Sequence, residues 1–275
     1  MIRTYFSHIS VFNFLNCNLN EQLCKVGQWL CVNKLSLNVD KSNFVVFHPP
    51  QKKVCYSINL LINDNIIRHE NSIKYLGIII DANLNWKEHV LHELCKKISR
   101  GIGILSKLRH FVSKSILIQI YYSLIYPYLT YGVIIWGNTY WCNIKPLYIM
   151  QKKAIPIVNF LSHQEHTSSY FKKDNFLKLA DIVKLYTALF MYQFYRDRLP
   201  VAFDDFFVLN NMKHDYNTRL SSKCSYSLPL VRTNYGILSI NFSGPKIWND
   251  IDEALKILST NLFKKKLKQN LIELY

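Results

Sequence analysis

The sequence predicts an α+β fold, in which one amphipathic helix and a few short antiparallel strands precede a mostly helical region. Three observations support this prediction. Apolar residues recur at helical spacing over residues 18–33, short apolar runs separated by turn-forming residues occupy residues 44–80, and helical spacing returns from Trp86 onward. With 275 residues, 49% of them hydrophobic, the chain can bury a large core.

The first predicted helix, over residues 18–33, coincides with three cysteines at seven-residue spacing, Cys17, Cys24 and Cys31. This spacing places them on one helical face, and we expect a packed apolar stripe, because zinc sites need closer spacing and a mixed set of ligands. The chain has seven cysteines in all, an odd number, and no Cys-x-x-Cys pair. Such usage favours a reducing compartment, and so an intracellular location in the nucleus or cytoplasm, over secretion.

The predicted strands follow in short runs. A strand over residues 44–47 is closed by two prolines, which cannot continue strand pairing. The Asn-Asp-Asn sequence at 63–65 predicts a hairpin turn between apolar runs at 57–62 and 66–67. Residues 73–80 are almost continuously apolar, and we expect them to form one strand.

From Trp86 to about Phe111 the pattern predicts a helix with one apolar and one basic face. The basic face carries Lys96, Arg100 and Lys107. The apolar face is expected to consist of Val90, Leu94, Ile98, Leu105 and Leu108. Phosphate binding explains a basic face of this kind, and a solvated helix surface is the alternative explanation.

The net charge of the chain also favours phosphate binding. It is +16, from 34 Lys and Arg against 18 Asp and Glu. Such an excess favours a polyanionic partner, with nucleic acid ahead of an anionic membrane surface. A lysine-rich composition without functional meaning is the alternative.

The stretch between Lys114 and Lys145 contains no charged residue and raises the question of a membrane span. Pro127, several polar residues and many tyrosines interrupt it. We therefore expect two buried helices that meet near Pro127, and no membrane partner.

The last third of the chain, from about residue 160, is expected to be helical to about Arg198 and irregular beyond it. Gly244 and Pro245 predict a turn. Trp248 is expected to fill a small core of its own.

Several blocks of this sequence occur in an order that is typical of one family. They are Trp29–Phe47, Tyr75-Leu-Gly-Ile-Ile-Ile-Asp81, Tyr121–Gly132 with Ile135-Trp-Gly137, Met150-Gln-Lys-Lys-Ala-Ile155, His214–Arg219 and Gly244–Asn249. Together they resemble the reverse transcriptases of LINE-type (non-LTR) retrotransposons, particularly the jockey-like group. Pro156 departs from the family pattern, which has a cation there, and is expected to kink the helix that begins at Met150.

The resemblance covers nearly the whole chain and implies its domain organisation. Residues 1–83 would be the end of a polymerase palm, built from a helix and short antiparallel strands. Residues 84–160 would form a helical, thumb-like region, and residues 161–275 a basic C-terminal region.

The resemblance also implies contacts with nucleic acid. The Tyr75 block corresponds to the primer-grip strand of the family, where a glycine lets the backbone lie close to a 3′ end, although an ordinary bulge is the alternative reason for Gly77. The expected nucleic-acid-binding residues are Tyr75, Gly77, Lys96, Arg100, Lys107, Lys152 and Lys153.

The catalytic residues of the family are expected to be missing from this chain. Nucleotidyl transfer uses two metal ions held by carboxylates, and the family places these before the Trp29 block, where this chain has no aspartate. Asp204-Asp205 imitates the polymerase box but lies far downstream, in an expected loop. Lys41 matches the lysine of the family's last palm motif, so by analogy with polymerases it is a possible vestigial general acid for pyrophosphate. We therefore expect no metal site and no cofactor here, although the intact polymerases use Mg²⁺.

The sequence thus predicts a C-terminal fragment of a retrotransposon RNA-directed DNA polymerase that is inactive alone. The alternative is a non-catalytic module that binds RNA or an RNA–DNA hybrid. In both cases the expected partners are the RNA template and the RNA–DNA hybrid, with no small-molecule substrate, and the oligomeric state stays open. An incomplete palm further predicts an exposed apolar face on the first helix.

Overall fold

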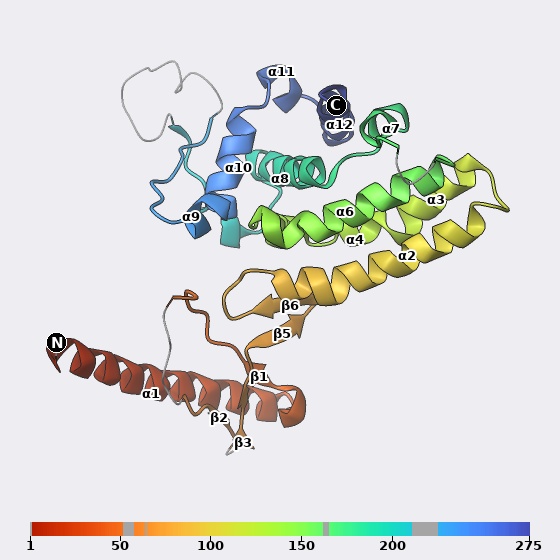
Figure 1. The fold of residues 1–275 in the computed structure, drawn as a ribbon. Coiled ribbons are helices and arrows are strands. Elements are labelled where there is room, and N and C mark those ends of the chain that lie inside the picture. Colours follow the sequence, from red (N-terminus) through yellow and green to blue (C-terminus); the bar gives the residue numbers. More distant parts are fainter. Residues whose placement is uncertain (1, 52–57, 64, 162–164, 211–224) are drawn as a thin grey trace. The chain divides into compact units, whose positions relative to one another are not determined.

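The structure is a computed structural model that describes residues 2–51, 58–63, 65–161, 165–210 and 225–275 (Figure 1). The block His214–Arg219 and residue 57 of the predicted hairpin lie outside these residues. The chain forms two compact units, Met1–Asn85 and Trp86–Tyr275. It is mixed α/β and mostly helical, with small sheets, as predicted. The assignment of its parts to a palm, a thumb and a C-terminal region stays a prediction.

The first unit is organised by α1 (Ile2–Val32), which begins well before the expected residue 18 because no proline or glycine interrupts the preceding residues. A hairpin of β2 (Leu61–Ile62) and β3 (Asn65–Ile66) confirms the predicted turn, and β2 packs against α1. Asn20 joins the two elements. Its side chain donates a hydrogen bond to the carbonyl of Asn59 (3.0 Å) and accepts one from the N–H of Leu61 (2.9 Å).

The three cysteines of α1 do not form a packed stripe, because Cys17, Cys24 and Cys31 are all exposed. The small hairpin is too short to cover these side chains, although it packs against α1. Val26 and Trp29 are 47% and 58% exposed as well. The expected exposed apolar side chains on this helix are therefore present.

Residues 72–81 form a hairpin and not the single strand that was expected over residues 73–80. β5 (Ser72–Tyr75) and β6 (Ile78–Asp81) pair antiparallel, with Tyr75 opposite Ile78. Leu76 and Gly77 between them have φ angles of 46° and 82°. Positive φ at both central residues is what a two-residue type I′ turn requires. Gly77 is thus the glycine of a turn, because an L side chain rarely adopts this conformation.

The remaining sheet of this unit departs from the predicted antiparallel strands, because it pairs β1 (Asn43–Phe44) in parallel with β4 (Arg68–His69). β1 is shorter than the strand expected over residues 44–47. The centres of the Phe44 and His69 rings are 5.2 Å apart. Phe44 also packs against the small core of the unit. That core consists of Leu60, Ile62 and Ile67.

The second unit consists of helices around one large core. Its first part contains the π-helical turn η2 (His89–Leu94), α2 (Cys95–Leu108), α3 (Lys114–Leu124), α4 (Tyr126–Thr130), α5 (Val133–Trp136) and α6 (Trp141–Val158). Its second part contains α7 (Ser168–Lys173), α8 (Leu179–Tyr195), the 3-10 helix η3 (Val201–Phe203), α9 (Asn234–Leu238), α10 (Ile240–Asn249), α11 (Glu253–Lys256) and α12 (Thr260–Glu273). Helix α2 runs alongside α3 and α6 (Figure 1).

The uncharged stretch forms short helices of this bundle. The two helices expected around Pro127 are confirmed, because α3 ends at Leu124 and α4 has Pro127 in its first turn. Within the described part of the chain, no helix combines the length and the apolar character needed to cross a membrane.

The expectation of an irregular chain beyond Arg198 is wrong, because α9 to α12 follow. Gly244 and Pro245 lie inside α10 and not in a turn. A Cβ at Gly244 would come within 2.8 Å of Met191 Sδ, so close packing against α8 explains the glycine. Trp248 is fully buried, as expected, but in the main core and not in a separate one. Tertiary packing here overrides the local preference for a turn.

The helix expected to begin at Met150 begins at Trp141, so the Met150–Ile155 motif forms its second half. Pro156 lies two residues before the end of α6, at Val158. A proline near the end of a helix removes one hydrogen bond of the last turn and leaves the rest of the helix intact.

Gln151 on α6 is fully buried and makes three hydrogen bonds. Its Nε2 donates to Tyr121 Oη on α3 (3.1 Å) and to the carbonyl of Leu177 (2.7 Å), and its Oε1 accepts from the N–H of Leu179 at the start of α8 (2.9 Å). Burial raises the pKa of the Tyr121 hydroxyl, which therefore stays protonated. Gln151 thus links α6 to α3 and to the beginning of α8.

Replacing Gln151 with leucine is expected to destabilise the second unit by about 3 kcal/mol, because three buried polar groups lose their partner. Urea unfolding measures this change. Lys152→Met, at the next and exposed position, is the control and is expected to change the stability by less than about 0.5 kcal/mol. A Gln151→Leu protein as stable as the control would show that these hydrogen bonds are dispensable.

Candidate nucleic-acid interface

Helix α2 separates its apolar and basic residues as the sequence predicts. Ile98 and Leu105 are completely buried, whereas Lys96, Arg100 and Lys107 are exposed. The positions of the three cations fall within a narrow arc of the helix, and they span about 16 Å along its axis at 1.5 Å per residue. We call Lys96, Arg100 and Lys107 the α2 stripe.

Within the part of the chain that the structure describes, the cations of the α2 stripe form no ion pairs. Neighbouring Lys97 is the contrast, because its Nζ lies 3.2 Å from Glu93 Oε2 and 5.4 Å from the centre of the Tyr128 ring. Among the residues that the structure describes, no carboxylate lies within ion-pair distance of the α2 stripe. These three charges are therefore free to bind an external anion.

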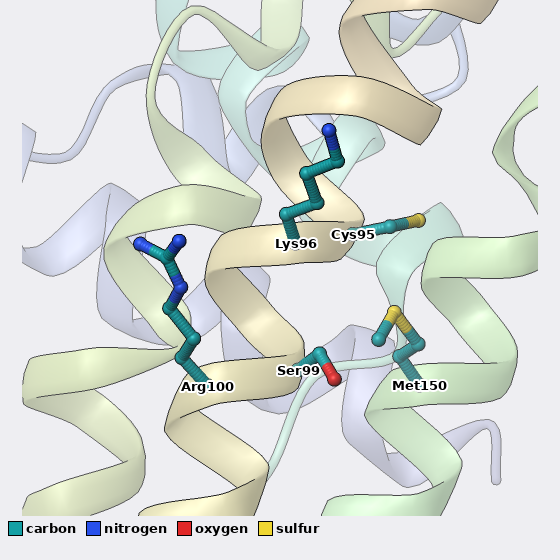
Figure 2. A pocket seen from close by; sticks show the side chains of 5 residues that line it. All are labelled: Cys95, Lys96, Ser99, Arg100 and Met150. Carbon is teal, nitrogen blue, oxygen red and sulfur yellow. The ribbon is translucent and has the colours of Figure 1, made fainter.

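A depression beside the stripe lies between α2 and α6. Figure 2 shows Lys96 and Arg100 on successive turns of α2, with Cys95 directed toward α6 and Met150 reaching from α6. Ser99 completes the lining. Burial raises the pKa of the Cys95 thiol, so this sulfur is protonated at neutral pH and is a packing group, not a nucleophile.

The two lysines predicted on α6 lie on different sides of that helix. Both are exposed. Lys153 follows Met150 by three residues and therefore lies near the side of α6 that carries Met150. Lys152 lies on another side, where its Nζ is 5.6 Å from the centre of the Tyr148 ring. Contact of Lys152 and Lys153 with nucleic acid stays a prediction.

The other predicted site residues belong to the first unit. Tyr75, at the end of β5, is 61% exposed, and Gly77 follows it in the hairpin turn. Lys41 is exposed at the end of the short 3-10 helix η1 (Val39–Lys41), which the side chain of Asn38 caps by accepting the N–H of Lys41 at 3.2 Å. Primer contact by Tyr75 and Gly77 stays a prediction, as does the vestigial role of Lys41.

The chain was compared with known proteins, and it is similar in sequence to three RNA-directed DNA polymerases. No family model and no solved structure matches the chain. It is 27% identical over 140 residues, 50% of its length, to the RNA-directed DNA polymerase from mobile element jockey of Drosophila melanogaster. The jockey polymerase of Drosophila funebris is 24% identical over 164 residues, 56% of this chain. The probable RNA-directed DNA polymerase from transposon X-element of Drosophila melanogaster is 27% identical over 142 residues, 49% of this chain.

The chain is a homologue of the RNA-directed DNA polymerases of jockey-like non-LTR retrotransposons. The resemblance inferred from its sequence blocks is thereby confirmed. The matched segments make up only 15%, 18% and 15% of these relatives, so this homologue spans less than a fifth of their length.

For a homologue of polymerases, the acidic pair Asp204-Asp205 is the obvious candidate for metal binding. Both residues are exposed in a turn after η3, as the predicted loop requires. Within the described ranges, no group of three or more His, Cys, Asp or Glu residues is placed to hold a metal ion.

Sequence reasoning did not single out two residues on the helices beside this surface, Gly103 of α2 and Gln151 of α6. Gly103 lies between Arg100 and Lys107, is exposed, and has open space around the position of a Cβ. The sequence did indicate this position, because Gly103 follows Arg100 by three residues and precedes Lys107 by four. Gln151 belongs to the Met150–Ile155 motif, but only its burial reveals what it does.

Proposed function

We propose that this chain holds the RNA template or the RNA–DNA hybrid of a retrotransposon reverse transcriptase, through the α2 stripe and Lys153, and corresponds to the C-terminal part of that enzyme. The observation that carries the proposal is a row of three cations that no described carboxylate pairs, on a helix whose opposite face is completely buried. A rigid helix that presents free charges along about 16 Å can follow several successive phosphates.

The proposed binding is independent of base sequence. Lysine and arginine side chains on an open surface meet phosphate oxygens, which carry no sequence information. Release of counterions from the nucleic acid drives such binding, and its strength falls steeply with salt. The net charge of +16 supports the proposal by attracting the polyanion over a longer distance.

The choice of RNA or hybrid rests on the relatives, whose names describe RNA-directed DNA polymerases. Such an enzyme must hold an RNA strand and the hybrid that it makes. We further propose that this chain binds these nucleic acids without extending a primer by itself. The exposed turn around Asp204-Asp205 supports that part of the proposal.

The triple variant Lys96→Gln/Arg100→Gln/Lys107→Gln tests the proposed surface. Because the variant removes three cations that would each meet a phosphate, the slope of log affinity against log salt is expected to become shallower by about 2 to 3, at 0.7 to 0.9 per phosphate. Fluorescence anisotropy with labelled single-stranded RNA and RNA–DNA hybrid across a salt series measures the slope.

The matched control is Lys264→Gln/Lys265→Gln/Lys266→Gln, which removes three exposed cations from α12. It is expected to change the slope much less, although the net charge is the same. If the two variants decrease the salt slope equally, the total charge of the protein, and not the α2 stripe, binds nucleic acid.

Gly103→Lys is expected to strengthen binding, because it adds a fourth cation to the stripe in open space. The salt slope should steepen by about 0.7 to 0.9. Gly103→Gln is the control, because both substitutions replace a helical glycine and should stabilise α2 by up to about 1 kcal/mol. If glutamine raises the affinity as much as lysine, the gain comes from helix stability and not from phosphate binding.

A primer-extension assay with Mg²⁺, template RNA and annealed DNA primer tests the absence of catalysis. The chain alone is expected to add no nucleotides, and Asp204→Asn/Asp205→Asn is expected to behave identically. Templated extension by the chain that the double substitution abolishes would overturn this part of the proposal.

A further inference from the structure

A second pair of cations lies in the same unit, on α12 and not on the helix of the α2 stripe. Lys264 and Lys268 are four residues apart, so their side chains share one side of α12. Lys264 is exposed, and Lys268 is half-buried. Like charges at this spacing repel each other, so the pair is unfavourable unless an anion lies beside it.

Tyrosine rings of two other helices lie against the two ammonium groups. Lys268 Nζ is 5.8 Å from the centre of the Tyr122 ring on α3, and Lys264 Nζ is 5.8 Å from the centre of the Tyr186 ring on α8. Tyr126 of α4 connects these tyrosines. Its ring centre is 5.1 Å from that of Tyr122, and its hydroxyl is hydrogen bonded to that of Tyr186. The two lysines are therefore held against one continuous cluster of rings.

The described part of the chain provides neither ammonium group with a counter-charge. No described Asp or Glu lies within ion-pair distance of Lys264 or Lys268. Burial and, to a smaller extent, the charge of Asp174 raise the pKa of Tyr122. However, this carboxylate is already paired, because its Oδ1 lies 2.6 Å from Lys114 Nζ. The positive charge of the α12 pair is thus left without compensation.

The protonation equilibrium of Lys268 shows the same imbalance. Burial and the neighbouring charge of Lys264 both lower the pKa of the Lys268 ammonium. A carboxylate in contact with this group would act in the opposite direction. An anion from outside the chain would therefore interact with both lysines and remove the cost of their repulsion.

We propose that Lys264 and Lys268 together bind a phosphate group that carries close to two negative charges. It is either inorganic phosphate or the terminal phosphate of a nucleic-acid strand. Two ammonium groups match the charge of such a group, and each offers three donors to its free oxygens. An internal phosphodiester has one charge and would balance only one lysine. The site goes beyond the proposed function, in which the α2 stripe binds phosphates within a strand.

Acylation with an amine-specific reagent tests the site in the intact chain. A dianion in contact with an ammonium group raises its pKa by about 1 or more. In saturating inorganic phosphate, the acylation rate of Lys268 is therefore expected to fall about tenfold, relative to sodium chloride of equal ionic strength and pH. Peptide mass spectrometry measures the rate at each lysine.

Lys265 and Lys266 are the controls within the same molecule, because both are exposed and lie on other sides of α12. Their acylation rates should differ little between the two salts. If phosphate protects Lys268 no more than it protects these two lysines, the proposed site does not exist.

Lys264→Gln/Lys268→Gln gives a second measurement that does not depend on lysine reactivity. Phosphate bound to the folded chain should raise the midpoint of thermal unfolding of the wild type. The double variant should lose this increase, whereas Lys265→Gln/Lys266→Gln, which has the same net charge, should retain it. If both variants respond to phosphate alike, a general salt effect explains the increase and the proposal is wrong.

Two oligonucleotides of one sequence, with a 5′-phosphate or a 5′-hydroxyl, distinguish the two sources of phosphate. If the phosphorylated strand protects Lys268 at a much lower concentration than inorganic phosphate does, the site holds the end of a strand. If inorganic phosphate is equally effective, the site holds free phosphate. Equal protection by the two strands would show that an internal phosphodiester suffices, and would overturn the proposed dianion.

The α2 stripe variant separates this site from the proposed strand-binding surface. Lys96→Gln/Arg100→Gln/Lys107→Gln should leave the protection of Lys268 by inorganic phosphate unchanged, because the stripe contributes no residue to the site. If this variant loses the protection, phosphate acts through the general charge of the protein and not through the lysine pair. If the stripe instead fails to bind RNA while Lys268 is still protected, only the proposed function is wrong.

Discussion

The burial of one amide, that of Gln151, is the interaction on which the arrangement of the second unit depends. Its two polar atoms meet partners on α3, on the segment before α8 and on α8 itself. Inside a core each such atom must find a partner, so these three hydrogen bonds hold α6 against α3 and the start of α8. Because α6 also packs along α2, this placement sets where Met150 lies beside Lys96 and Arg100.

The proposed nucleic-acid interface rests on charge that the described part of the fold leaves unpaired. The α2 stripe offers charge on an open surface, and its cations are available because the described fold gives them no carboxylate, in contrast to Lys97. Phosphate contacts of the proposed kind hold a strand anywhere along its length.

Much of the local structure and of the basic surface could be predicted from the sequence. The two faces of α2 follow directly from residue spacing, because helical periodicity decides which side chains share a side. The turn at residues 63–65 follows from the residue types that tolerate turn conformations. The reversal at Leu76-Gly77 was not predicted, because most residues from 73 to 80 are apolar, as in one continuous strand. The exposure of Cys17 could not be predicted either, because a heptad pattern does not show how much of a helix its neighbours cover.

The sequence by itself indicated the similarity to jockey-like polymerases, the fold class and the side of α2 on which the cations lie, since these depend on residues close together in the chain. Only the tertiary structure decided that Gly244 lies inside a helix against Met191, and that Gln151 joins α6 to Tyr121 of α3 and to the start of α8. The physical reason is the same in each case. The burial of a side chain and its hydrogen-bond partners depend on atoms contributed by distant parts of the chain. The local spacing of residues in the sequence does not show these contacts.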